Sequence, residues 1–233
     1  MLASHSVGIY RNTECATLLA HEAVEAVEAA QAAVVVLGSV YTAGVSPETP
    51  VLFLYDEFDA ASLFSRISQI SRISPVVVVD TQKAEPEMIR SLLPHCPPVL
   101  DRLPRVIPRM LAAIKAERAR ARERVLIIVD PLPGPSTTAQ LMLMACDTVV
   151  FPFDGTRESC SALLLFLHLV PSWLEQYKTI LKSHRPRIVI FTPDTESAAL
   201  ASQQMRQRPA DAVVQGSVAT LLAYLEQGAW FGV

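Results

Sequence analysis

Short aliphatic runs, separated by segments of helical periodicity, constrain the fold of this 233-residue chain more than any other feature. Six runs of four or five residues predict strands at residues 34–37, 51–54, 76–79, 125–129, 148–151 and 187–191. Strands that are apolar throughout are typical of a sheet that is covered on both faces. Because predicted helices fall between them, we expect an α/β fold with three layers, in which helices flank both faces of a mostly parallel sheet.

The segments between the strands predict helices of ordinary length. They lie at residues 16–33, 60–73, 86–93, 137–145, 159–177, 196–206 and 217–226, with another that ends near Glu123. No segment has the length and composition of a linker between two domains. We therefore expect a single domain over residues 1–233, in which residues 1–50 form an N-terminal helix and strand extension of a core at 51–233.

The composition is unusually apolar for a soluble protein, with 51% hydrophobic and 18% charged residues. The aliphatic runs are much shorter than the ~20 residues that span a bilayer, so stable membrane insertion is not expected. The apolar excess must be buried inside the domain or against a partner. The N-terminus carries no secretory signal pattern, and the four cysteines form no C-x-x-C pair. This pattern predicts a cytoplasmic protein with reduced thiols.

Charge and ligand patterns argue against two further classes of protein. The formal net charge of −3 does not favour a dedicated nucleic-acid binder, which is usually basic. The five histidines show no metal-ligand spacing, so we expect no metal.

Carboxylates follow several predicted strands. They are Asp56, Glu57, Asp80, Asp130, Asp154 and Asp194. In open α/β sheets the chemistry sits at the carboxyl ends of the strands, and acidic groups there suit a magnesium–nucleotide site or a phosphoacceptor site. The alternative is structural, because short polar residues commonly end strands and cap the helices that follow.

Two stretches indicate a family. The run VLIIVDPLPG (residues 125–134), a helix, ACDTVVFPF (residues 145–153) and a further helix resemble the second half of ParA/MinD-type ATPases, the deviant-Walker branch of P-loop proteins. Upstream, VVVVDTQ (residues 76–82) resembles the strand that follows the family's phosphate-loop helix, with Asp80 at its end. The resemblance covers roughly residues 51–230 and rests on order and spacing.

The resemblance implies roles for individual positions. Asp130 matches the Walker B aspartate, Pro133 and Gly134 the turn after it, Asp147 the family's Ala-Asp position, and Pro152 the proline that ends the next strand. The implied fold is that of a P-loop NTPase.

The phosphate-binding loop is the main departure from the family. The resemblance implies a loop between the strand at 51–54 and the helix at 60–73, where the sequence reads YDEFDAAS and holds neither glycine nor lysine. Asp56, Glu57 and Asp59 would instead repel a triphosphate, at about 4 kcal/mol for a like-charge pair ~4 Å apart at an effective dielectric of ~20. No Gly-Lys dipeptide occurs anywhere in the chain. We therefore expect a pseudo-ATPase without a nucleotide cofactor.

Three other interpretations remain open at this stage. The chain could be a nucleotide-dependent ATPase switch with an atypical loop. It also resembles a receiver domain, in which Asp56 and Glu57 would hold magnesium and Asp130 would accept phosphate. A RecA-type fold without Walker motifs, as in accessory subunits, predicts much the same biology as the leading interpretation.

The leading interpretation is a scaffold, adaptor or positioning factor that works by protein–protein interaction, as a homodimer or in a hetero-assembly. Tyr55, Phe58 and Leu132 are the candidate contacts, because apolar anchors ringed by polar groups make good interface centres.

Overall fold

The computed structural model describes residues 5–10, 19, 22–23, 33–38, 51–53, 76–80, 111–112, 115–116, 125–129, 137–182, 184–205 and 210–228. In this part of the chain, no helix is both long enough and apolar enough to cross a membrane.

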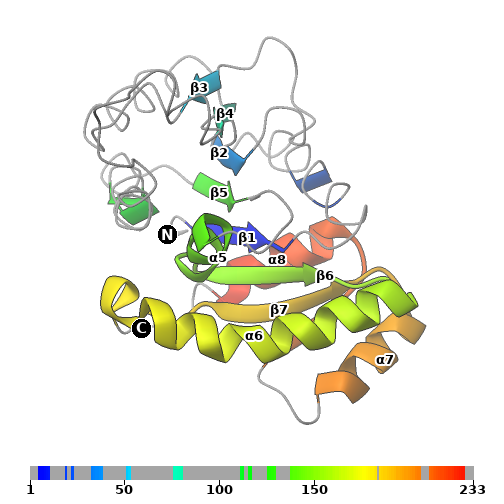
Figure 1. The fold of residues 1–233 in the computed structure, drawn as a ribbon. Helices are drawn as coiled ribbons and strands as arrows, with labels where there is room; N and C mark the ends of the chain where they lie inside the picture. Colours follow the sequence, from blue (N-terminus) through cyan, green and yellow to red (C-terminus); the bar gives the residue numbers. More distant parts are fainter. Residues whose placement is uncertain are drawn as a thin grey trace.

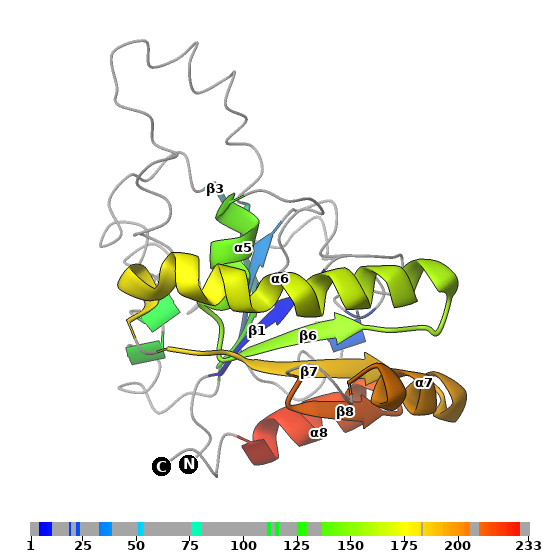
Figure 2. The same ribbon diagram turned by 60° about the horizontal axis from the view of Figure 1, so that its bottom comes forward.

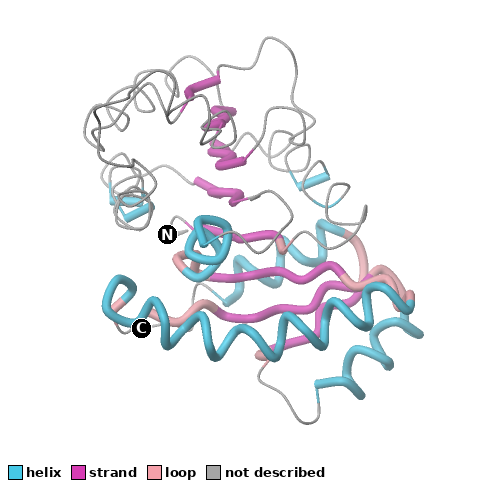
Figure 3. Tube along the Cα trace, viewed as in Figure 1, coloured by secondary structure: helices cyan, strands magenta, loops and turns pink. Residues whose placement is uncertain are grey.

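Eight parallel strands form one sheet (Figures 1 and 3). They are β1 (His5–Ile9), β2 (Ala33–Gly38), β3 (Val51–Phe53), β4 (Val76–Asp80), β5 (Val125–Val129), β6 (Thr148–Pro152), β7 (Arg187–Thr192) and β8 (Ala212–Gln215). Their order across the sheet is β3-β4-β2-β5-β1-β6-β7-β8, and every ladder between described strands is parallel. Each strand therefore ends at the same edge of the sheet, which we call the carboxyl edge. The opposite one is the amino edge.

Helices cover both faces of this sheet, as the apolar runs predicted. They are α5 (Thr137–Met144), α6 (Arg157–Leu181), α7 (Thr195–Met205) and α8 (Val218–Gly228). Figure 2 shows α5 and α6 on one side of the sheet and α8 on the other.

Alternate residues of each strand serve the two faces. Phe151 packs with Phe166 of α6 in one core cluster, which also contains Ala201 of α7. Its neighbour Val150 packs with Leu221 and Leu225 of α8 in the other cluster. This alternation explains why the strands are apolar throughout.

The six predicted strands are all present, with small differences at their ends. The helix predicted at 159–177 is longer, because it begins after Thr156, whose side chain caps it by accepting the Ser159 N–H at 3.2 Å. The predicted helices at 16–33, 60–73 and 86–93 and the one ending near Glu123 lie largely or wholly outside the described residues.

Two strands, β1 and β8, were not predicted. β1 lies in the middle of the sheet between β5 and β6, and β2, which was predicted, lies between β4 and β5. Residues 1–50, predicted as a helix and strand extension of the core at 51–233, thus supply two interior strands of the sheet. The second missed strand, β8, forms the edge beyond β7.

Gly8 explains how β1 fits beneath α5. A Cβ atom at this position would lie 2.9 Å from Leu143 Cδ2 and 3.2 Å from Cys146 Sγ. The close approach of α5 to the central strand therefore favours glycine there.

Candidate functional site

The carboxyl edge is the expected place for chemistry, and the structure locates part of the predicted acidic set there. Asp80 is the last residue of β4 and is paired along the backbone with Gly38 and Phe53. Asp154 and Asp194 follow β6 and β7. The remaining predicted site residues, Tyr55, Asp56, Glu57, Phe58, Asp59, Asp130 and Leu132, lie outside the described residues.

Asp154 is a local capping residue. Its Oδ1 accepts the Thr156 N–H at 3.0 Å and the Thr156 hydroxyl at 2.8 Å. Burial opposes ionisation of this carboxyl, but hydrogen bonds from Ser159 and Thr156 outweigh it and hold its pKa below the usual value.

Asp194 plays the same part at the start of α7. It accepts the Ser197 N–H at 2.8 Å and the Ser197 hydroxyl at 2.9 Å. These hydrogen bonds lower the pKa of Asp194. Asp154 and Asp194 therefore act as caps of the helices that follow their strands, which is the structural alternative given above. Neither carboxylate is an unpaired group that points at a ligand.

The strand order identifies where a nucleotide would bind in a sheet of this kind. Ligands of open α/β sheets lie at the carboxyl edge where the strand order reverses. Here the chain runs from β1 through β2 to the edge strand β3, returns through β4 to β5, and then continues on the other side of β1 with β6. The reversal is therefore at β1, with β5 and β6 beside it.

This topology moves the position at which a phosphate loop is to be sought. β3, which precedes Tyr55, is the edge strand and is separated from β5 by β4 and β2. The segment that leaves the central strand is residues 10–17, with the sequence YRNTECAT, and described helical residues follow at Leu19, Glu22 and Ala23. This segment also contains neither glycine nor lysine.

Tyr10 anchors the chain as it leaves β1. Its N–H donates to the Val150 carbonyl at 2.9 Å, which continues the pairing with β6. Its ring stacks on Phe151, with centroids 5.3 Å apart, and lies 4.5 Å from the ring of Phe166 and 6.5 Å from that of Trp173. The first residue after β1 is thus held by the sheet and by the aromatic cluster beneath α6.

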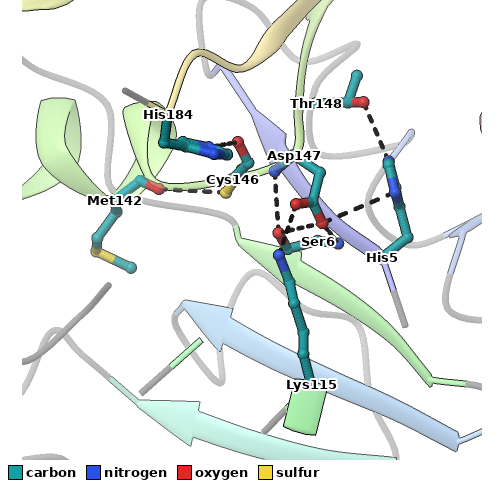
Figure 4. A network of polar contacts seen from close by, with 8 residues as sticks. All are labelled: His5, Ser6, Lys115, Met142, Cys146, Asp147, Thr148 and His184. Atoms are coloured by element: carbon teal, nitrogen blue, oxygen red, sulfur yellow. Dashed lines mark hydrogen bonds and ion pairs between the residues drawn. The ribbon is translucent and has the colours of Figure 1, made fainter. Parts of the chain in front are cut away.

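The most connected polar group in the described part of the chain lies at the opposite, amino edge (Figure 4). Asp147, the residue at the Ala-Asp position of the resemblance, accepts the N–H and the hydroxyl of Ser6 on Oδ2, at 2.7 and 2.9 Å. Its Oδ1 binds the ammonium group of Lys115 at 2.6 Å. The N–H of Asp147 donates in turn to the Ser6 hydroxyl at 3.0 Å.

His5 completes this network beside Asp147. Its Nε2 lies 3.0 Å from the Thr148 hydroxyl, and its Nδ1 lies 3.7 Å from Asp147 Oδ2. Burial lowers the pKa of His5, although the Asp147 carboxylate acts in the opposite direction. Burial also opposes ionisation of Asp147, but Lys115 and Ser6 outweigh it and keep the pKa of this carboxyl low.

The network is suited to joining parts of the chain. It ties the beginning of β1 to the beginning of β6 and to a helical segment at Lys115. The adjacent Cys146 is fully buried, and burial raises the pKa of its thiol, which therefore stays protonated. Within the described ranges, no group of three or more His, Cys, Asp or Glu side chains could hold a metal ion.

Sequence patterns alone did not identify the partners in this network. Ser6 lies 141 positions from Asp147, and Lys115 lies 32 positions away. The only available signal was the Asp147 position itself, through the family resemblance.

Comparison with known proteins shows similarity in structure without detectable similarity in sequence. No family model matches the chain, and no curated protein matches it. Protein DIP2308 from Corynebacterium diphtheriae is 12% identical over 98% of this chain and 99% of its own, with a TM-score of 0.58. A ParA family ATPase from Chlorobium tepidum is 14% identical over 97% and 90%, with a TM-score of 0.54.

A third solved structure is an ATP complex of a Cyanothece McdA variant. It is 14% identical over 98% of this chain and 89% of its own, with a TM-score of 0.52. At these identities the similarity establishes a shared fold over nearly the whole chain. The α/β fold predicted from the aliphatic runs is thus confirmed by its own topology and by these structures.

Proposed function

We propose that this chain is a ParA-like protein that neither binds nor hydrolyses nucleotide and that acts by binding other proteins, as a scaffold, adaptor or positioning factor. Two findings support the proposal. The fold is shared with a ParA family ATPase and with McdA. The segment that follows β1, where the strand order reverses, contains neither glycine nor lysine.

The segment after β1 is the observation that carries the proposal. A phosphate loop needs glycines, so that successive backbone N–H groups can wrap the phosphates, and a lysine that reaches their oxygens. The sequence YRNTECAT offers neither. The Tyr10 N–H is already bonded to Val150, so it is not available to a phosphate oxygen. The segment after β3, YDEFDAAS, lacks glycine and lysine as well, so the proposal holds for either position.

The strand order disfavours the phosphoacceptor alternative. In that interpretation Asp56 and Glu57 after β3 would share a magnesium ion with Asp130 after β5. Three strand spacings separate β3 from β5, which is about 14 Å at ~4.8 Å per spacing. Carboxylates at the ends of these strands start too far apart to coordinate one ion.

The proposed contact surface is the group of apolar residues Tyr55, Phe58 and Leu132, which follow β3 and β5 in the sequence. In a chain that has a nucleotide-binding fold but no phosphate loop, selection can act on the surfaces that contact other proteins. The hydrophobic fraction of 51% is consistent with a partner that covers some of this area.

A pull-down from the native host tests this surface. We expect the wild-type protein to recover a specific partner, or to form a homodimer by light scattering, and Phe58→Asp to abolish the interaction. The matched control is Leu165→Asp on α6, which introduces the same charge at a side chain that is 54% exposed. A monodisperse wild-type monomer that recovers no partner, or a partner retained equally by Phe58→Asp, would contradict the proposal.

A further inference from the structure

A cavity of about 1070 Å³ opens at the amino edge of the sheet. One wall is the helical segment that carries Leu111 and Lys115, and the other is the last turns of α6, with Thr179 and Ile180. Asp147 and His184 also line it, so the cavity borders the polar network of Figure 4. Its volume is that of a small-molecule site.

The described walls are apolar over much of their extent. The exposed Ala112 and the half-buried Ile180 of α6 offer apolar surface to the cavity, whereas Leu111 and Leu181 are only 1% and 7% exposed. Leu111 and Leu181 belong to the core cluster on this face of the sheet. A ligand with an aliphatic body can therefore be covered by the protein.

The charged groups in the lining favour a negative ligand. The described lining contains two lysines, Lys115 and Lys182, and one carboxylate, Asp147, so it carries a net charge of +1. The whole chain, in contrast, has a net charge of −3. Among the described residues, Asp147 occupies one of the three N–H donors of Lys115.

Of the two lysines, Lys182 has fewer interactions with described charged groups. It caps the carboxyl end of α6 and forms no ion pair with another described residue. The partial negative charge at the end of this helix, about half an elementary charge, is smaller than the charge of Lys182. A ligand with a single negative charge is thus favoured beside Lys182.

We propose that this cavity is a binding site for a small amphiphilic acid, with its carboxylate between Lys115 and Lys182 and its aliphatic part between Ala112 and Ile180. The inference does not depend on the proposed function, because the cavity lies at the amino edge of the sheet, whereas β1 ends at the carboxyl edge.

Three probes of the full-length protein separate charge from apolar contact. Sodium octanoate carries both features, 1-octanol carries the aliphatic chain alone, and inorganic phosphate carries negative charge alone. We expect saturable calorimetric binding of octanoate, accompanied by an increase in Tm. The dissociation constants of octanol and phosphate should be at least about tenfold larger than that of octanoate. This is the factor expected from a single charge-assisted hydrogen bond.

Two substitutions locate the site. Lys182→Gln should weaken octanoate binding about tenfold by removing one charged contact. Thr179→Trp should reduce binding by filling the cavity from its exposed rim. Lys178→Gln is the matched control, because Lys178 lies one turn earlier on α6, is paired with Glu175 and does not line the cavity.

Each outcome decides the proposal. Octanoate binding that Lys182→Gln and Thr179→Trp weaken, and that Lys178→Gln leaves unchanged, supports it. Absence of saturable octanoate binding overturns it, as does octanol binding of equal strength or equal loss in all three variants. Calorimetry with Mg-ATP reports separately on the proposed function, so failure of one proposal is not failure of the other.

Discussion

At the scale of single residues, Asp147 makes a structural contribution that can be measured. The side chain satisfies the Ser6 N–H and hydroxyl and neutralises Lys115. Asp147→Ala removes the acceptor for all three and leaves buried donors without a partner. We expect the free energy of unfolding in urea to fall by about 2–3 kcal/mol.

Asp147→Asn provides the matched control for this prediction. The amide keeps the shape of the side chain and an oxygen for one donor but loses the charge opposite Lys115. Its effect should lie between those of wild type and Asp147→Ala. A change below about 0.5 kcal/mol for the alanine variant, the level of an ordinary surface substitution, would show that the network does not stabilise the fold.

A second prediction at this scale concerns pH. Burial holds the pKa of His5 below 6.5 in the folded protein, so the unfolded chain binds a proton more readily. Stability from this group is fully present above about pH 6.5 and falls as the pH drops through that value towards the folded pKa. Asp147, whose pKa is lowered by Lys115 against the effect of burial, adds a further loss below its ordinary value of 3.8.

The test is chemical denaturation between pH 8 and pH 5, a range chosen about the ordinary pKa of histidine. His5→Gln should flatten the dependence of the unfolding free energy on pH, and His168→Gln, at an exposed position of α6, is the matched control. An unchanged pH profile in His5→Gln would exclude His5 as the source.

The contacts of Asp147 illustrate what the sequence could and could not indicate. The position itself was marked by the ACDTVVFPF pattern. Its partners could not be inferred, because they depend on β1, and β1 depends on a polar residue, Ser6, being buried in a strand. That burial is tolerated only because Asp147 satisfies the Ser6 hydroxyl.

At the scale of elements, the predicted strands are those in which aliphatic residues are continuous. The segments VVVVD, VLIIV and RIVIF are almost entirely aliphatic, and this alone predicts strands of a sheet that is covered on both faces. The missed strands are weaker in this respect, since β1 reads HSVGI and β8 reads AVVQ. β1 is nevertheless the central strand. Gly8 leaves room for Leu143 of α5, and the Ser6 hydroxyl is hydrogen-bonded to Asp147, so neither position requires a larger apolar residue.

Gly8 gives a prediction for the packing of β1 against α5. In Gly8→Ala the new methyl group would lie 2.9 Å from Leu143 Cδ2, so the leucine must move. Overpacking of a core typically costs about 1–3 kcal/mol, and we expect a loss of unfolding free energy in that range.

A double-mutant cycle distinguishes this contact from a general effect of the substitution. Leu143→Ala alone should destabilise the protein by leaving a cavity, whereas Gly8→Ala and Leu143→Ala together should cost less than the sum of the two. Strict additivity would contradict the proposed contact between β1 and α5.

At the scale of the whole molecule, the two edges of one parallel sheet have different characters. At the carboxyl edge, Asp154 and Asp194 cap the helices that follow β6 and β7. The amino edge carries the Asp147 network and the cavity beside it. The structural similarity to a ParA family ATPase extends over 97% of this chain, so the two share a fold.

The sequence-based expectation of a missing phosphate loop rested on the segment after residues 51–54, because β1 had not been recognised. The strand order moves the position to residues 10–17, and only the topology could show this. The same residue types are absent from both segments, and this is why the proposed function does not change with the position.

Calorimetric titration of the purified full-length protein with Mg-ATP tests the central claim most directly. The claim is that a ParA-like fold has here lost its nucleotide. We predict no heat of binding at physiological nucleotide concentrations, and no hydrolysis above background in the same samples. A saturable titration with a micromolar Kd would contradict the account.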